Sequence, residues 1–291
     1  MENLKALVVD DTIVYRKIVG DVLKEIPGVE VVGTANNGKV AMSKIASLKP
    51  DIISLDIEMP EMSGIEVLQA LQGQQDAPVV IMLSTLTQQG SEMTIKALEL
   101  GAFDFVPKPS EGRMAENVEK VKAAILPIVD TLKRQRNARQ RLKEKIQAAP
   151  AEKVARPAAP VVKPRTTIAR SKSEIIGIGI STGGPNALGV MIPKLPGNLK
   201  VPVLIVQHMP PMFTASLANS LNAKSDLYIK EAEDGEPLEP GKVLIAPGGK
   251  QMKILADMDG ITRKVKITDD PPENSCKPSV DYLFRSIAQH Y

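Results

Sequence analysis

The first 132 residues alternate five times between short apolar runs and longer stretches whose apolar residues recur at helical spacing. Short apolar runs predict buried strands, and the spaced patterns predict amphipathic helices. Five strand–helix units in succession predict a doubly wound parallel sheet of flavodoxin-like α/β type. The expected strands are Leu4–Val9, Val29–Val32, Asp51–Leu55, Pro78–Leu83 and Ala102–Val106, and the expected helices are Val14–Glu25, Lys39–Leu48, Ile65–Gln72, Glu92–Leu100 and Ala115–Val129.

A second alternating pattern occupies residues 174–291 and predicts a second doubly wound α/β domain. It opens with an apolar run to Ile180, a helical pattern from Asn186 to Leu195 and another apolar run, Val201–Val206. The later expected elements are a helix at Phe213–Leu221, strands at Leu227–Ala232, Val243–Ala246, Met252–Ala256 and Lys264–Thr268, and a last helix at Val280–Tyr291.

The segment between the two patterns, residues 133–173, has a different composition. It holds thirteen basic residues and two acidic ones, so its charge is +11, whereas the rest of the chain carries −8 within a total of +3. The last helical pattern of the first domain, which can kink at Pro127, continues into this segment as a charged, Arg-rich stretch to about Gln147. From Ala148 onward Pro, Ala and basic residues dominate, and they offer too little apolar surface for a core. We expect a flexible, basic linker.

A basic linker could bind DNA or an acidic membrane surface. However, no helix-turn-helix pattern follows it, and the chain has no Trp and only four Tyr and four Phe for stacking on bases. We therefore expect no nucleic-acid partner. There is no apolar run long enough for an integral membrane segment, and the N-terminus does not resemble a signal peptide. The single cysteine, Cys276, suits a reducing compartment, so we expect a cytoplasmic protein.

The first strand–helix junction of the second domain has the pattern Gly179-x-Ser181-x-Gly183, with Pro185 as an early helical residue. This pattern is typical of a nucleophile elbow, a tight turn that exposes a serine hydroxyl. The next apolar run ends at His208. If the two strands are parallel neighbours, nucleophile and base emerge together at the carboxyl edge of the sheet.

An alternative is a dinucleotide-binding turn, because Gly177-x-Gly179-x-x-x-Gly183 resembles one. Such a site needs a carboxylate for the ribose at the end of the second strand, where this chain has His208. The pattern therefore favours the serine–histidine interpretation.

The first domain carries a group of acidic residues at predicted strand ends. Asp10 and Asp11 follow the first strand, and Asp56 follows the third, which neighbours the first in the flavodoxin-like order. Crowded carboxylates favour a hard cation, most plausibly Mg²⁺, with which Asp56 could attack a phosphoryl group. Ser84 and Lys108 end or follow two further strands, where a phosphate oxygen needs a donor and a cation.

The first domain resembles the response-regulator receiver family. The motifs that carry this resemblance are Asp10-Asp11, Asp56-x-x-Met59-Pro60-x-x-x-Gly64, Ser84 and Lys108-Pro109. It implies that Asp56 is the phosphoacceptor, that Asp10 and Asp11 help to hold Mg²⁺, and that Ser84 and Phe105 form a switch pair. The alternatives are that the acids are solvated loop residues and that Phe105 is simple core packing.

The second domain resembles the catalytic domain of the chemotaxis protein-glutamate methylesterases. The matching segments are Ile178-Gly179-Ile180-Ser181-Thr182-Gly183-Gly184-Pro185, Gln207-His208-Met209-Pro210-Pro211-x-Phe213-Thr214, Ala246-Pro247-Gly248-Gly249 and Pro278-Ser279-Val280-Asp281. The resemblance implies Ser181 as nucleophile and His208 as general base, with Thr182 and Gly183 lining the site and no cofactor for ester hydrolysis.

The chain departs from that family in one respect. The family's acidic triad member lies in a Gly-x-Asp-Gly segment downstream of the last predicted helix, and this sequence stops in or just after that helix. The resemblance therefore implies that the C-terminal part of the catalytic domain is missing. Asp269, Asp270 and Asp281 are poor substitutes by position, so the triad acid is left unassigned.

Together the two resemblances imply a phosphorylation-activated hydrolase for chemotactic adaptation. It would remove methyl esters from chemoreceptor glutamates and deamidate receptor glutamines, with methylated chemoreceptors as substrates and a chemotaxis histidine kinase as phosphodonor. The alternative is a catalytically impaired regulator that acts as a phosphate sink or competes for the kinase.

Overall fold

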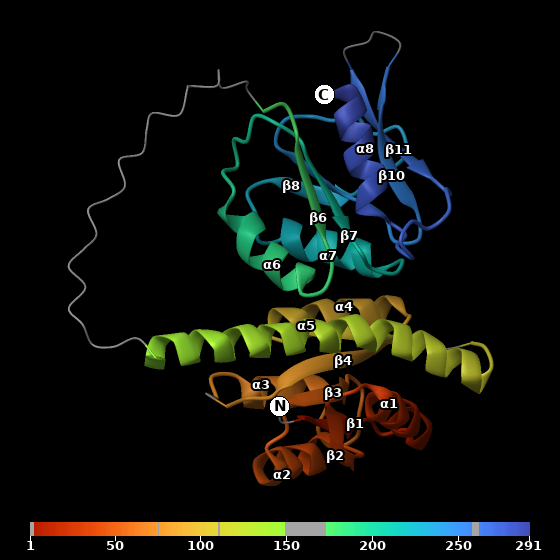
Figure 1. The fold of residues 1–291 in the computed structure, drawn as a ribbon. Coiled ribbons are helices and arrows are strands. Elements are labelled where there is room, and N and C mark those ends of the chain that lie inside the picture. Colours follow the sequence, from red (N-terminus) through yellow and green to blue (C-terminus); the bar gives the residue numbers. More distant parts are fainter. Residues whose placement is uncertain (1–2, 75, 110, 149–172, 258–261) are drawn as a thin grey trace, which may run out of the picture.

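The computed structural model describes residues 3–74, 76–109, 111–148, 173–257 and 262–291. Two α/β domains are stacked on one another, and helices α4 and α5 of the first lie between the two sheets (Figure 1). The predicted α/β fold class is confirmed for both domains.

The first domain is a five-stranded parallel sheet in the order β2-β1-β3-β4-β5. Two apolar clusters cover its faces, one with α1 and α5 and the other with α2, α3 and α4. Parallel strands buried on both faces explain why its strands are almost continuously apolar. The elements are β1 (Leu4–Val9), α1 (Ile13–Glu25), β2 (Val29–Ala35), α2 (Gly38–Leu48), β3 (Ile52–Asp56), α3 (Gly64–Leu71), β4 (Val79–Thr85), α4 (Gln88–Glu99), β5 (Asp104–Lys108) and α5 (Met114–Ala148).

The second domain has a four-stranded parallel sheet in the order β6-β7-β9-β8 and a separate antiparallel pair, β10-β11. Helices α6 and α7 pack on one face, and α8 packs with β10 and β11 on the other. The elements are β6 (Ile176–Ile180), α6 (Gly184–Met191), the 3₁₀ turn η1 (Ile192–Lys194), β7 (Val203–Gln207), α7 (Phe213–Asn222), β8 (Tyr228–Glu231), β9 (Lys242–Ile245), β10 (Gln251–Ala256), β11 (Arg263–Thr268) and α8 (Val280–His290).

Two glycines in β6 allow α8 to pack closely against this strand. A Cβ added at Gly177 would lie 2.7 Å from Ile287, and one at Gly179 would lie 2.4 Å from Val280. An added Cβ would therefore force the side chains of α8 to shift, most of all the β-branched Val280, so glycine favours this close approach. The Gly-x-Gly spacing of β6 thus serves packing against α8 as well as the turn that follows it.

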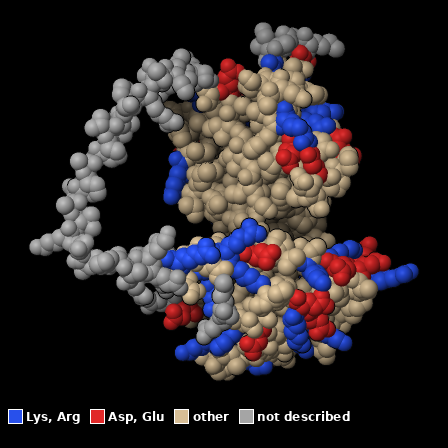
Figure 2. Space-filling model, viewed as in Figure 1, with Lys and Arg blue, Asp and Glu red and all other residues tan. Residues whose placement is uncertain are grey.

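Helix α5 continues through Pro127 to Ala148, in agreement with the charged continuation expected to about Gln147. Side chains of the extension contact the first domain, because Lys133 donates to the Pro27 carbonyl and Arg136 lies 3.4 Å from the Asp51 carboxylate. Lys and Arg side chains gather along this part of α5 (Figure 2). Residues 149–172 of the predicted linker lie outside the described residues, and the predicted flexibility of the linker stays a prediction.

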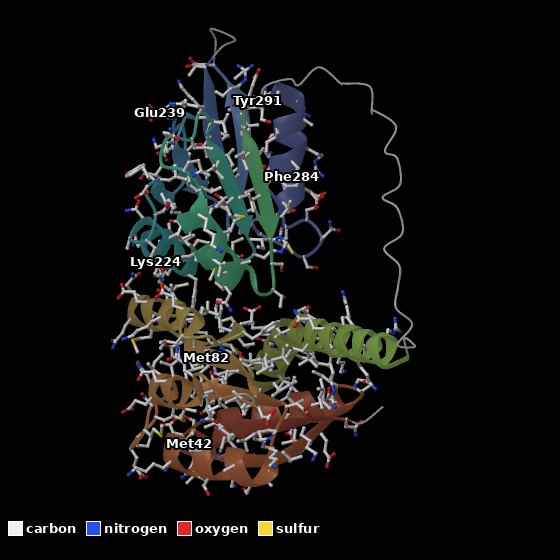
Figure 3. All side chains as sticks on the ribbon, turned by 90° about the vertical axis from the view of Figure 1, so that its left-hand side faces the viewer. Met42, Met82, Lys224, Glu239, Phe284 and Tyr291 are labelled. Atoms are coloured by element: carbon white, nitrogen blue, oxygen red, sulfur yellow. The ribbon has the colours of Figure 1, made fainter. Side chains whose placement is uncertain are left out.

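The two domains meet where α4 contacts α6 and α7, and where β5 contacts the starts of the same two helices. The rings of Phe105 and Phe213 stack with centroids 4.6 Å apart, and the hydroxyls of Ser91 and Ser216 lie 2.8 Å apart. At the rim, Lys224 reaches toward α4 (Figure 3) and lies 2.6 Å from Glu99. Buried apolar residues of both domains form one continuous cluster across this contact. The first domain therefore borders whatever site the second domain carries.

Candidate active site and phosphoacceptor site

The acidic site lies at the carboxyl ends of β1 and β3, which are neighbours in the sheet. Asp10 follows β1, Asp56 is the last residue of β3, and one oxygen each from Asp10, Asp11 and Asp56 lie within 4.8 Å of one another. Lys108, at the end of β5, places its Nζ 2.7 Å from Asp10 Oδ2 and 2.7 Å from Asp56 Oδ2. All four predicted residues are thus brought together, and three oxygen ligands suit a hard divalent cation.

Burial dominates the electrostatics of this acidic site. Burial raises the pKa of Asp56 to about 6, although the nearby Lys108 charge opposes the rise. Burial also disfavours the charged form of Lys108, but Asp56 and Asp10 outweigh it, so the pKa of Lys108 is raised. The pocket therefore holds a permanent cation beside a carboxylate that is costly to ionise. A bound divalent cation would favour the ionised Asp56, the form that can act as a nucleophile.

Ser84 and Phe105 both make contacts outside the acidic site in this structure. Ser84 Oγ donates to the Gly90 carbonyl (3.2 Å) and accepts from Thr94 Oγ1 (2.5 Å), so it is held by α4. Phe105 is buried by stacking on Phe213 of the second domain. Phe105 thus contributes to the domain interface, and its predicted switch role stays a prediction.

The serine–histidine pair lies at the carboxyl ends of β6 and β7. These strands are parallel neighbours, and the backbone N–H of His208 donates to the Ile180 carbonyl (3.2 Å). Ser181 Oγ lies 3.3 Å from His208 Nδ1. The two predicted residues therefore stand within hydrogen-bond reach, the geometry in which an imidazole can take a proton from a serine hydroxyl.

The side chain of Gln207 bridges the backbone carbonyls of Ser181 and His208, a role that was not predicted from the sequence. Its Nε2 donates to the Ser181 carbonyl (3.1 Å) and to the His208 carbonyl (3.3 Å), and the residue is buried. Its amide packs against Gly184, where an added Cβ would lie 1.9 Å from Gln207 Oε1. The only signal in the sequence was its position beside His208, which the motif match included without a role.

The surroundings of His208 are neutral and partly buried. Burial lowers its pKa, and the charge of Asp281 partly opposes this. Its Nε2 is buried and has no hydrogen-bond partner among the described residues. On the other side of the ring, Cys276 Sγ lies 3.4 Å from Nδ1. No pattern in the sequence places Cys276 in this site, because it lies 68 positions away from His208.

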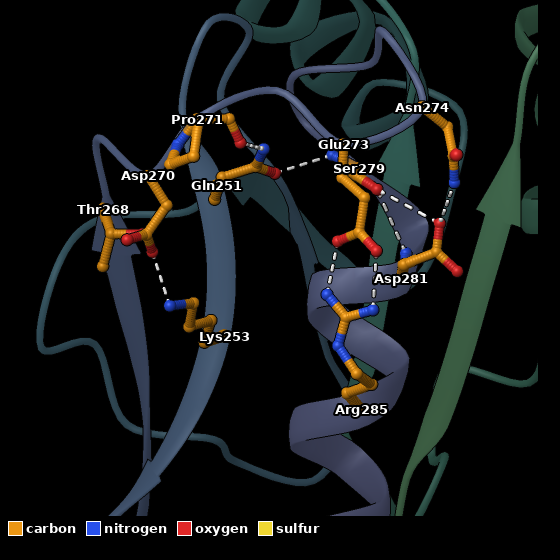
Figure 4. Close-up of polar contacts among 10 residues, drawn as sticks. All are labelled: Gln251, Lys253, Thr268, Asp270, Pro271, Glu273, Asn274, Ser279, Asp281 and Arg285. Atoms are coloured by element: carbon orange, nitrogen blue, oxygen red, sulfur yellow. Dashed lines mark hydrogen bonds and ion pairs between the residues drawn. The ribbon is translucent and has the colours of Figure 1, made fainter.

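The three acids that were considered as triad members bind elsewhere. Asp269 accepts from Lys250 at 2.7 Å and Asp270 pairs with Lys253 at 2.5 Å, whereas Asp281 Oδ2 accepts from Asn274 Nδ2 at 3.2 Å (Figure 4). Across the described part of the chain, no carboxylate hydrogen-bonds to His208. The triad acid therefore remains unassigned.

A cleft of about 370 Å³ between the domains contains the serine–histidine pair. The second domain contributes Ser181, Thr182 and His208 to its lining, and the first contributes Asp104 and Phe105. Gly183 adopts a left-handed conformation (φ 71°) at the start of α6, and its N–H donates to Asp104 Oδ2 at 3.2 Å. Burial raises the pKa of Asp104 to about 6, against the N–H donors of Phe105 and Gly183. The first domain thus occupies part of the space in front of Ser181.

Comparisons with known proteins identify the families of both domains. Residues 176–291 match the "CheB methylesterase" family and residues 6–119 match the "Response regulator receiver domain" family. A curated protein-glutamate methylesterase/protein-glutamine glutaminase from Desulfotalea psychrophila is 55% identical over all of this chain and 80% of its own length. The chain belongs to the protein-glutamate methylesterase/protein-glutamine glutaminase family.

Other members of this family are also similar over nearly the whole chain. The protein-glutamate methylesterase/protein-glutamine glutaminase of Bacillus subtilis is 42% identical over 98% of this chain and 78% of its own length. A crystal structure of the Thermotoga maritima CheB methylesterase catalytic domain is 41% identical, with a TM-score of 0.40, and the match covers 42% of this chain and 63% of that one. Within the described ranges, no helix is both long and apolar enough to span a bilayer.

Proposed function

We propose that this protein is a phosphorylation-controlled hydrolase that removes methyl esters from chemoreceptor glutamates and deamidates chemoreceptor glutamines. The observation that carries the proposal is the 3.3 Å separation of Ser181 Oγ and His208 Nδ1 inside a cleft. Family membership supplies the substrate class, because the curated relatives are named for these two reactions. No finding favours the alternative of a catalytically impaired regulator.

In the proposed reaction, Ser181 Oγ attacks the acyl carbon of the side-chain ester or amide while His208 Nδ1 accepts the hydroxyl proton. The protonated imidazole then gives this proton to the leaving group, which departs as methanol or ammonia. Water, deprotonated by the same nitrogen, hydrolyses the acyl-serine and leaves a glutamate carboxylate. The lowered pKa of His208 keeps the imidazole neutral, as a general base must be at neutral pH.

Control by phosphorylation would begin at Asp56. In this proposal Mg²⁺ is held by Asp10, Asp11 and Asp56, a chemotaxis histidine kinase is the phosphodonor, and Lys108 pairs with the phosphoryl oxygens. Ser84 would leave its contacts with Gly90 and Thr94 to reach the phosphoryl group, and Phe105 would move with it. Because Phe105 stacks on Phe213, such a movement would disturb the domain contact and open the cleft at Ser181. A cytoplasmic location follows from these proposed partners.

Methanol release from methylated receptor membranes tests the proposal. The chain should release methanol, and acetyl phosphate with Mg²⁺ should increase the rate of release. The variants Ser181→Ala and His208→Gln should release no methanol under either condition. Ser47→Ala is the matched control, since this exposed hydroxyl bonds only to carbonyls of its own helix. Full activity in Ser181→Ala would rule out the proposed nucleophile.

A further inference from the structure

Cys276 is held against His208 by a loop with its own polar anchors. The loop joins β11 to α8, and Arg285 forms two contacts with the Glu273 carboxylate (Figure 4). Asn274 donates to Asp281 at 3.2 Å, and Lys277 Nζ donates to the Asp269 carbonyl at 3.0 Å. These contacts flank Cys276 on both sides, so the position of its sulfur is set by the fold of the loop.

The ring nitrogen that faces Ser181 also faces the thiol. Cys276 Sγ lies 3.4 Å from His208 Nδ1, and Ser181 Oγ lies 3.3 Å from the same atom. A separation of 3.4 Å suits a hydrogen bond from sulfur, whereas 3.3 Å is long for a hydroxyl. Burial raises the pKa of Cys276, with a further contribution from Asp281, so the thiol stays protonated and can donate.

The direction of the hydrogen bond between the thiol and Nδ1 is linked to the tautomer of the imidazole. If the thiol donates to Nδ1, that nitrogen carries no proton and the ring proton is on Nε2. This is the tautomer in which Nδ1 can accept the proton of Ser181. Among the described residues, Nε2 has no hydrogen-bond partner that could impose the same choice from the other side of the ring.

We propose that Cys276 is a positioning residue for the hydrolysis, whose S–H group holds His208 with Nδ1 unprotonated and turned toward Ser181. This inference rests on the proposed function for its consequence, but its structural content can be tested separately. No bond to sulfur forms or breaks.

The composition of the chain allows a direct test by NMR, because there are only two histidines and one cysteine. In the full chain with ¹⁵N-labelled histidine, the ring nitrogens of His208 should show Nδ1 unprotonated and Nε2 protonated at neutral pH. Cys276→Ala should mix the two tautomers and raise the pKa of His208, since a hydrogen bond to the neutral ring is lost. Cys276→Ser should restore both properties, because a hydroxyl also donates.

The signal of His290, at the far end of α8, is the internal reference and should not change between variants. Cys276→Val serves as a second variant without a donor, and it fills the space that alanine leaves. An unchanged tautomer and unchanged pKa of His208 in both Cys276→Ala and Cys276→Val would overturn the proposal. This outcome does not depend on whether the chain hydrolyses esters.

Activity supplies the second measurement. Loss of one weak hydrogen bond should lower kcat roughly two- to tenfold in Cys276→Ala and Cys276→Val, with KM unchanged and Cys276→Ser close to the parent chain. A rise in KM with unchanged kcat would show that Cys276 contacts the substrate, and it would overturn the positioning role. If neither the parent chain nor any variant hydrolyses the ester, but the NMR spectra change as expected, the proposed function fails and the positioning of His208 by Cys276 is retained.

Discussion

The two candidate sites of this protein are built from different kinds of interaction. In the first domain, the buried carboxylates of Asp10 and Asp56 each lie 2.7 Å from Lys108, so opposite charges define the pocket. In the second domain, Ser181 and His208 are placed by strand pairing, by the Gln207 amide and by a thiol, all of them neutral. The first site can respond to a change of charge, whereas the second depends on small distances between neutral groups.

This difference suits a regulator joined to an enzyme. A phosphoryl group on Asp56 would add negative charge beside the positive charge of Lys108. The first site can therefore gain or lose this group without a change in the strands of the sheet. The second domain contacts the first through Phe213 and through Gly183, which starts α6 two residues after Ser181. The stacked rings of Phe105 and Phe213 are therefore where a change of charge in one site can become a change of distance in the other.

The largest expected effect is on phosphorylation of the charged site. Asp56→Asn should abolish Mg²⁺-dependent labelling by acetyl phosphate, because an amide is not a nucleophile toward phosphorus. Chelation of Mg²⁺ should have the same effect on the parent chain. Asp51→Asn, at the opposite end of β3, is the control and should label normally. Equal labelling of Asp56→Asn would show that another residue is the phosphoacceptor.

A steric change should break the neutral site. Gly184→Ala places a Cβ 1.9 Å from Gln207 Oε1, so it should lower the free energy of unfolding of the second domain by about 1–3 kcal/mol and reduce esterase activity. Gly189→Ala lies in the same helix with no heavy atom within 4 Å, and it should stabilise the domain by about 0.5–1 kcal/mol. Urea denaturation measures both values. Equal effects of the two variants would contradict the role of the Gln207 contact.

Removing a buried charge should stabilise the first domain in a pH-dependent way. The pKa of Asp56 is raised to about 6, so its contribution to stability is present at low pH and is lost as the pH rises through 6. Asp56→Asn should therefore raise the free energy of unfolding by about 1–2 kcal/mol at pH 8, after allowance for the lost contact with Lys108. At pH 4 the variant and the parent chain should be alike in urea denaturation. A destabilised variant at pH 8 would contradict the raised pKa.

The smallest expected effect is on the contact between the domains. Because burial raises the pKa of Asp104 to about 6, its protonated form favours the docked arrangement, and docking should weaken as the pH rises from 5 to 8. Small-angle X-ray scattering should show a larger radius of gyration at pH 8. His208 lines the same cleft and also titrates, so a control must separate the two groups. In the Asp104→Asn variant the radius of gyration should stay constant from pH 5 to pH 8. A pH dependence that persists in Asp104→Asn would assign the effect to another group.

Much of the fold was accessible from the pattern of apolar residues. The expected strands agree with the observed ones to within a few residues, because parallel strands buried on both faces are apolar along their whole length. The end of α5, expected at about Gln147, lies at Ala148, because the charged, Arg-rich stretch continues the helix and is held by contacts such as Arg136 with Asp51. The pairing of Ser181 with His208 was also accessible, because both residues end neighbouring parallel strands.

The sequence by itself determined the residues whose positions follow from strand ends: Asp10, Asp56, Lys108, Ser181 and His208. Only the tertiary structure decided what lies against them. Cys276 reaches His208 across 68 positions, and Asp104 reaches Gly183 across 79, through a loop and a domain contact that no local pattern encodes. Periodicity in a sequence reports which face of an element is buried. It does not report which distant side chain packs against that face, because this depends on how whole helices, strands and loops are arranged in the folded protein.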